Sequence, residues 1–164
     1  MIEEHDYRAL WQEVHARGVT VRTPGIAWTD PDQDNDRGLV LTIRHGRHRF
    51  LLLGDVSEDV EDRIAGGMPD MTVVQVSHHG SRTSSNPSLI AAASAHTAVI
   101  QSGLGNRFGH PHDQTIARWE GTKVRRTDTL GSLRFRSDGQ HVIAQYWDPA
   151  YGWRSLPNQR AEFH

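Results

Sequence analysis

The chain has 164 residues, with 18 Lys plus Arg against 20 Asp plus Glu and no cysteine. This length suits one domain with its own core, and the near-neutral charge gives no overall electrostatic field for nucleic acid. The missing cysteines exclude disulfides and thiolate metal sites, and the sequence has neither a signal peptide nor an apolar run of the roughly 20 residues that span a membrane. We therefore expect a single soluble domain over residues 1–164, in which His, Asp and Glu are the strong metal ligands.

The chain opens with an expected helix over residues 3–18, which stops at a glycine. An acidic loop follows a short strand and carries four alternating aspartates from Asp30 onward. A calcium-binding EF-hand loop starting there needs Gly at its sixth position and Glu at its twelfth, where this chain has Asn35 and Leu41. The pattern favours a solvated acidic loop over a calcium site.

The middle of the chain alternates strands with helices. Residues 38–55 predict a hairpin turning at Gly46, whose second strand is apolar enough to be covered on both faces. The expected elements that follow are a helix at 56–67, a strand at 71–77, a helix at 87–95, a strand at 96–103, a helix at 112–121 and a strand at 123–127. The tail predicts a closing hairpin that turns at Asp138-Gly139, with Trp147, Tyr151 and Trp153 packed onto the sheet. This order indicates an α/β fold.

Polar side chains follow three of these strands directly. Asp55 ends one, the pair His78-His79 ends the next, and Asn106 with His110 follows the third. If the strands are neighbours, these groups meet at one rim of the sheet. Imidazole and carboxylate suit zinc or manganese, although an aspartate in this position can equally cap the following helix.

Four strings resemble a known family: LLLGD, VSHHGSRTSSN, SGLGNRFGHPH and RRTDTLGSLRF. They are similar to the second half of the metallo-β-lactamase-type domain at the C-terminal end of ComEC, the DNA-internalisation protein of competent bacteria, over roughly residues 35–136. The resemblance implies an αββα sandwich with a metal-bridging Asp55 and a histidine ligand at His78. His79 could be the ligand instead, because only one histidine of such a pair normally points inward.

The family's first motif, of the type HxDxDH, is absent, and the nearest string is His5-Asp6. We therefore expect the sandwich to be incomplete, with the N-terminal part of the fold missing, so that the chain corresponds to about the last two-thirds of the domain. The resemblance implies two zinc or manganese ions in an intact domain. For this chain alone we expect weak metal binding or none, and no hydrolytic activity.

The implied function is metal-dependent hydrolysis of DNA phosphodiesters during natural transformation, with single-stranded DNA as the expected substrate. The expected partner is the membrane channel of the full-length protein, which would place the domain at the inner membrane. The residues of this hypothesis fall into three groups. They are Asp55, His79 and His110 for catalysis, Asp55, His78 and His79 for metal, and Ser81, Arg82, Ser84, Asn106 and Arg107 for phosphate or DNA.

Further arginines, Arg125 and Arg126, are weaker candidates for holding the DNA backbone. Two other functions stay open. One is hydrolysis of a small phosphodiester or cell-wall phosphoester by the same fold. The other is a non-catalytic binding module that keeps only part of the site.

Overall fold

The structure is a computed structural model that describes residues 18–23 and 38–156. The helix expected at 3–18, the string His5-Asp6 and nearly all of the acidic aspartate loop lie outside these ranges. Within them, no helix is both long and apolar enough to cross a membrane.

The described residues form two β-sheets. The larger has six strands in the order β1-β2-β3-β4-β5-β6, and the smaller has three in the order β7-β8-β9. The strands of the larger sheet are β1 (Val19–Arg22), β2 (Leu41–His45), β3 (His48–Leu52), β4 (Val73–Gln75), β5 (Thr97–Ile100) and β6 (Lys123–Arg126). Those of the smaller sheet are β7 (Leu133–Ser137), β8 (Val142–Asp148) and β9 (Gly152–Ser155).

The first three strands of the larger sheet pair antiparallel, and the pairs β3–β4, β4–β5 and β5–β6 are parallel. The predicted hairpin is thus confirmed as β2–β3. The strands that precede Asp55 and the histidine pair, β3 and β4, are neighbours, with Leu51 opposite Val74. Parallel pairing brings the carboxyl ends of β3, β4 and β5 to one edge of the sheet.

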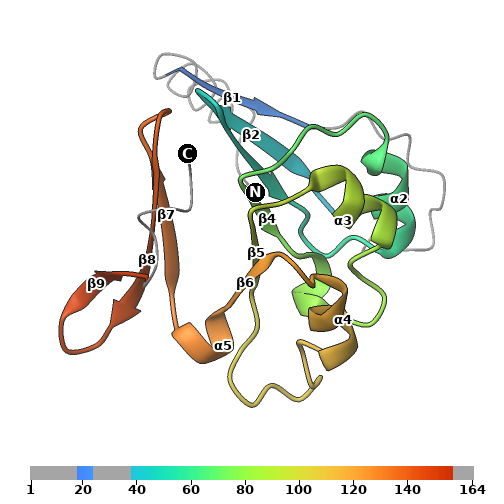
Figure 1. Cartoon of the computed structure of the whole chain (residues 1–164). Helices are drawn as coiled ribbons and strands as arrows, with labels where there is room; N and C mark the ends of the chain where they lie inside the picture. Colours follow the sequence, from blue (N-terminus) through green and yellow to red (C-terminus); the bar gives the residue numbers. More distant parts are fainter. Residues whose placement is uncertain (1–17, 24–37, 157–164) are drawn as a thin grey trace, which may run out of the picture.

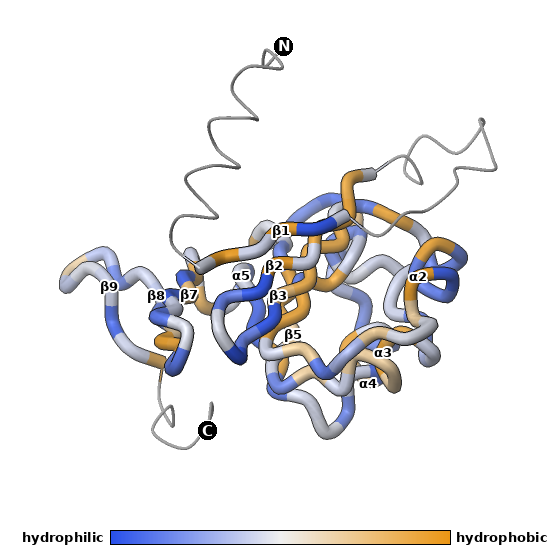
Figure 2. The backbone as a smooth tube through the Cα atoms, turned by 90° about the horizontal axis from the view of Figure 1, so that it is seen from above, coloured by the Kyte–Doolittle hydropathy of each residue, from blue (hydrophilic) through white to orange (hydrophobic). Residues whose placement is uncertain are grey.

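Helices cover one face of the larger sheet, and the smaller sheet lies on its other side (Figure 1). These helices are α2 (Glu58–Ala65), α3 (Pro87–Ala93) and α4 (Asp113–Arg118), and a 3-10 turn, η2 (Ser77–Gly80), follows β4. The short α5 (Thr127–Leu130) lies apart from them, at the link between β6 and β7 (Figure 1). Figure 2 shows the hydrophobic segments gathered in the strands and on the helices beside them. The α/β class predicted from the sequence is confirmed, and the arrangement is consistent with an α/β sandwich.

The core lies between the larger sheet and its helices. Leu51 and Leu53, at and just beyond the end of β3, are fully buried there together with Trp119, which follows α4. The second hairpin strand has the helices on one face and the smaller sheet on the other, and its residues on the second face, Phe50 and Leu52, are half-buried. They line a cavity of about 450 Å³ that β7 borders from the other side.

The tail differs from its prediction in one respect. Its first hairpin turns at Asp138-Gly139 as expected, and the chain then turns again to add β9. The packing expected for the aromatic residues was wrong for two of the three, since Trp147 is 45% exposed and Tyr151 is 74% exposed. The seven-residue strand β8 extends the hairpin away from the larger sheet (Figure 1); Trp147 lies near its end and Tyr151 in the turn that follows.

The two sheets touch where their hairpin turns meet. Arg47 donates its backbone N–H to Gly139 O at 3.2 Å and its guanidinium to Gln140 O. A Cβ at Gly46 would come within 2.2 Å of Gly139 O, and the backbone there has φ +58°. Glycine at position 46 therefore permits both the left-handed turn and the close contact between turns.

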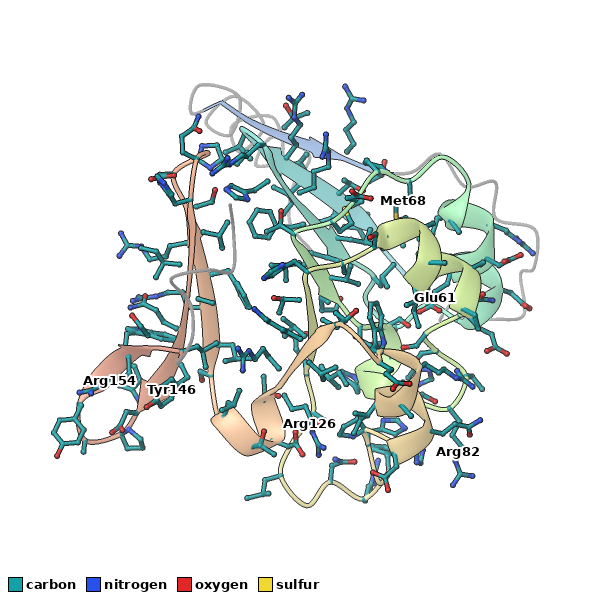
Figure 3. All side chains as sticks on the ribbon, in the orientation of Figure 1. Glu61, Met68, Arg82, Arg126, Tyr146 and Arg154 are labelled. Atoms are coloured by element: carbon teal, nitrogen blue, oxygen red, sulfur yellow. The ribbon has the colours of Figure 1, made fainter. Side chains whose placement is uncertain are left out.

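One glutamate is fully buried in this fold. Glu61 on α2 receives hydrogen bonds from the Ser77 hydroxyl and from the backbone N–H groups of Ser85, at 3.1 Å, and Asn86, at 2.5 Å. These three donors belong to η2 and to the loop before α3. The carboxylate thus ties helix α2 to the segment that follows β4 (Figure 3).

We predict that Glu61→Ala lowers the free energy of unfolding by about 3 kcal/mol or more, because it leaves two backbone N–H groups and a hydroxyl buried without partners. Urea denaturation followed by circular dichroism measures the change. Asp59→Ala is the matched control, since Asp59 is exposed on the same helix, and it should change stability by less than about 0.5 kcal/mol. Equal effects of the two substitutions would contradict the role assigned to Glu61.

The same residue predicts a pH dependence. Burial raises the pKa of Glu61 above its usual value of 4.5, against the opposing effect of the hydrogen bonds from Asn86, Ser77 and Ser85. The folded state then binds the proton more tightly than the unfolded state, so its stability falls as the pH rises from about 4.5 through the folded pKa. The free energy of unfolding, measured relative to Glu61→Gln at each pH, should therefore decrease between pH 4.5 and 7. An increase would mean that the hydrogen bonds outweigh burial.

Candidate metal and phosphate site

Three chain segments meet at the edge where β3, β4 and β5 end. The first is Gly54-Asp55, the second is the turn η2, and the third is the loop of residues 101–112. Backbone hydrogen bonds join them, from His78 N to Gly54 O at 2.9 Å and from His112 N to Gly80 O at 3.0 Å. The predicted convergence of the three strand ends is therefore present.

The histidine pair sits on a strained backbone. His78 and His79 have φ values of +46° and +55°, in the left-handed region that side chains other than glycine rarely adopt. Gly80 continues the turn at φ +79°, where a Cβ would come within 2.7 Å of Pro111. Such conformations cost roughly 1–3 kcal/mol each and are concentrated at functional sites.

His79 is held in a defined orientation. Its Nδ1 lies 2.8 Å from Gln101 O, and its Nε2 lies 3.5 Å from Asp55 Oδ1. A carbonyl oxygen only accepts hydrogen bonds, so Nδ1 carries the proton, and in the neutral ring Nε2 presents a lone pair to the carboxylate. Two electron-pair donors at this separation attract a cation, either a proton on Nε2 or a metal ion. Both side chains are about half exposed, at 49% for His79 and 53% for Asp55.

A cluster of imidazole rings surrounds this pair. The His110 ring centroid lies 6.5 Å from that of His79, 5.9 Å from that of His78 and 5.1 Å from that of His112. Burial lowers the pKa of His110, and the nearby His112, His78 and His79 lower it further. Sequence reasoning did not single out His112, although its spacing of two residues from His110 was visible.

An open cavity of about 460 Å³ lies beside His79. Its lining includes two residues predicted for the site, Asn106 and His110, and two that the sequence did not indicate, Phe108 and Thr127. Asn106 shapes the loop rather than offering its amide to a ligand. Its Nδ2 donates to Gly103 O and His110 O, and its Oδ1 accepts from the N–H groups of Phe108 and His110.

The remaining predicted residues lie apart from the cavity lining. Ser84 is fully buried and donates its hydroxyl to Ser81 O, which is a structural role and not the phosphate contact predicted for it. Ser81 is almost buried beside Thr83. Arg82 is exposed on the helix side of the molecule, well away from Arg126 (Figure 3).

The arginines predicted to bind DNA differ in the contacts that their side chains make. Arg107 places its guanidinium 4.8 Å above the ring of Phe108, a residue that lines the cavity. Arg126 forms a two-point ion pair with Asp128, which lowers the pKa of that carboxyl. None of the three arginines Arg107, Arg125 and Arg126 lines the cavity. Arg107 is the strongest candidate to meet a ligand there, because its guanidinium stacks on Phe108, which does line it.

The donor chemistry at Asp55 and His79 fits part of a metal site. A carboxylate oxygen and an imidazole lone pair are zinc and manganese ligands, and the bond from Nδ1 to a backbone carbonyl is the usual support of a metal-binding histidine. Two ligands about 2 Å from one tetrahedral ion lie about 3.3 Å apart, close to the 3.5 Å seen here. Among the described residues, no group of three or more His, Asp or Glu side chains is placed to hold an ion.

Comparison with known proteins gives several relatives, although no family model matches the chain. "ComE operon protein 3" of Bacillus subtilis is 32% identical over 111 residues, which are 65% of this chain and 14% of that protein. "Competence protein ComA" of Neisseria gonorrhoeae is 36% identical over 117 residues, or 68% of this chain and 17% of the relative. "Recombination protein 2" of Haemophilus influenzae is 32% identical over 103 residues, covering 62% of this chain and 13% of the relative.

This chain thus spans about a sixth or less of the length of these relatives. The similarity covers about two thirds of the chain in the two longest matches, and it agrees with the resemblance carried by the strand-end strings. The chain is therefore a domain that belongs to the ComEC family.

Proposed function

We propose that this domain contributes Asp55 and His79 to a divalent-metal centre that hydrolyses phosphodiester bonds of DNA during DNA uptake. The main support for this proposal is the geometry of the pair. Gln101 O fixes the proton on Nδ1 of His79, and the Nε2 lone pair therefore faces Asp55 Oδ1 at 3.5 Å. DNA uptake is supported by the names of the relatives, one of which is a competence protein and another a recombination protein.

Zinc or manganese, when bound, would supply an activated water and would stabilise the charge that develops on the phosphodiester. The rest of the work falls to residues of this chain. His110 lines the cavity beside His79 and would exchange a proton with a bound phosphodiester or water. Arg107, above Phe108, would meet a phosphate at the cavity rim. His78, in contact with His110, is the alternative metal ligand.

Single-stranded DNA is the proposed substrate. The proposed partner is the remainder of the natural protein at the membrane, since the relatives are several times longer than this chain. The exposure of Asp55 and His79 leaves the pair accessible to a strand that approaches from solvent.

A non-catalytic binding module is the second candidate. The observation that favours it is that the described residues offer only a pair of well-placed ligands, whereas a closed zinc site takes four. In that case the strand-end loops would bind a phosphate group without cleaving it. Metal binding and hydrolysis must therefore be measured separately.

The metal prediction concerns the 164-residue chain. Zinc binding, measured by isothermal titration calorimetry, should weaken at least tenfold in Asp55→Ala and in His79→Ala, because each substitution removes one of two ligands. Asp59→Ala, which removes an exposed carboxylate four residues away, should bind zinc as the unmodified chain does. Unchanged affinity in both ligand variants would show that the ion binds elsewhere.

The hydrolysis prediction concerns the longest natural polypeptide that contains this sequence. Asp55→Ala should lower the manganese-dependent degradation of single-stranded DNA by about 100-fold or more, because losing a metal ligand removes several kcal/mol of transition-state stabilisation. Circular dichroism on the same sample checks that the fold is retained. Hydrolysis that persists in the folded variant would exclude Asp55 from catalysis. Lost folding would give Asp55 a structural role, although not the helix-capping role that its position suggested, because the N-cap residue of α2 is Ser57.

A further inference from the structure

The outward face of the smaller sheet carries arginine and tryptophan side chains in register. Side chains alternate along strands, and directly paired residues share a face. The pairs Arg134–Gln145, Arg136–Ile143 and Trp147–Trp153 therefore lie on one face, which we name the Arg–Trp face. The neighbouring positions on the other face include Val142 and Ala144, which are buried, whereas Ile143 is 48% exposed and Trp147 45% exposed.

Contacts within the Arg–Trp face hold its side chains in place. Arg134 donates from Nε, at 3.1 Å, and from Nη2, at 2.7 Å, to Oε1 of Gln145. This orients the guanidinium with its carbon 4.1 Å from the centre of the Trp153 ring. Trp153 in turn meets Trp147 edge to face, with centroids 5.4 Å apart at 73°. The face is therefore preorganised, and less conformational entropy is lost when a ligand binds.

The charge of this face selects the class of ligand. The strand positions that form it include no acidic residue, and no carboxylate in the described ranges forms an ion pair with Arg134 or Arg136. The guanidinium groups of Arg134 and Arg136 attract a polyanion, and the partly exposed indole rings beside them can stack on flat rings of the same ligand. A nucleic acid has both features. A duplex keeps its base faces stacked inside, and a second copy of the same face would bring like charges together.

We propose that the Arg–Trp face binds single-stranded nucleic acid, with bases stacked on Trp147 and Trp153 and phosphates held by Arg134 and Arg136. This surface is separate from the strand-end site, because none of its residues lines the cavity beside His79. The biological role of this binding rests on the proposed function, because an enzyme that hydrolyses single-stranded DNA must hold its substrate. The binding chemistry itself needs no metal.

The test uses the full 164-residue chain in EDTA. Fluorescence anisotropy compares a labelled single-stranded 20-nucleotide DNA with a duplex of that sequence and with an abasic strand of equal length and charge. The chain should bind the base-containing single strand at least tenfold more tightly than the duplex or the abasic strand. Binding of this strand should also quench the tryptophan fluorescence of the chain. Trp153→Ala should weaken binding by roughly 5- to 150-fold, as expected when one stacking platform is lost.

Two variants guard against misfolding and against a simple charge effect. Trp153→Phe retains a ring and should keep most of the affinity. Arg154→Ala is the control for charge, because it removes one positive charge from the same strands on their opposite face, where Arg154 pairs with Tyr146 and stacks on Tyr151. It should change the affinity by less than about twofold. Figure 3 shows Tyr146 and Arg154 together on this sheet, far from Glu61.

Several results would overturn the proposal. They are the absence of saturable binding, equal affinity for the abasic strand, or an unchanged affinity in Trp153→Ala. Dimerisation of the chain that Trp147→Ala abolishes would instead make this face a protein interface. Asp55→Ala should bind the strand in EDTA as the unmodified chain does. A variant that loses hydrolysis but keeps this binding would therefore be defective at the metal site only. Hydrolysis of DNA by a protein that does not bind DNA through the Arg–Trp face would refute the present proposal and leave the proposed function standing.

Discussion

The parallel pairing of β3, β4 and β5 is the constraint on which the site depends. Because the three strands run in the same direction, their carboxyl ends meet at one edge, and residues 55, 79 and 110 come together there although they are distant in the sequence. The pairing is stabilised by the apolar layer of Leu51, Val74 and Ala98 against the helices. On the same side, the buried Glu61 ties the turn after β4 to helix α2. Packing between the larger sheet and its helices therefore positions the site residues at the sheet edge.

Much of this fold could be predicted from the sequence because its strands are short apolar runs that end at glycine, aspartate or histidine. Such local signals identify elements, and the alternation of strands and helices indicates a parallel sheet. They do not report how closely each face of a strand is covered, so the half-burial of Phe50 beside the fully buried Leu51 could not be predicted. They also did not reveal β9, because a second turn after Asp148 leaves little trace in the hydrophobic pattern.

The site was predictable in its members but not in its geometry. The position of Asp55 and the histidine pair after successive strands was enough to nominate them. The ring nearest Asp55 is set by the left-handed backbone at His78 and His79 and by the carbonyl of Gln101, none of which is encoded by spacing. Burial likewise decides the role of Ser84, whose hydroxyl residue type had suggested a phosphate contact.

The proposed sharing of one divalent ion by His79 and Asp55 can be observed by anomalous diffraction from crystals of the chain grown with zinc. We expect a zinc peak about 2.0–2.2 Å from both Nε2 of His79 and a carboxylate oxygen of Asp55, with Nδ1 still bonded to Gln101 O. A zinc ion bound elsewhere, or none at this pair while His79 and Asp55 form a direct salt bridge, would contradict it.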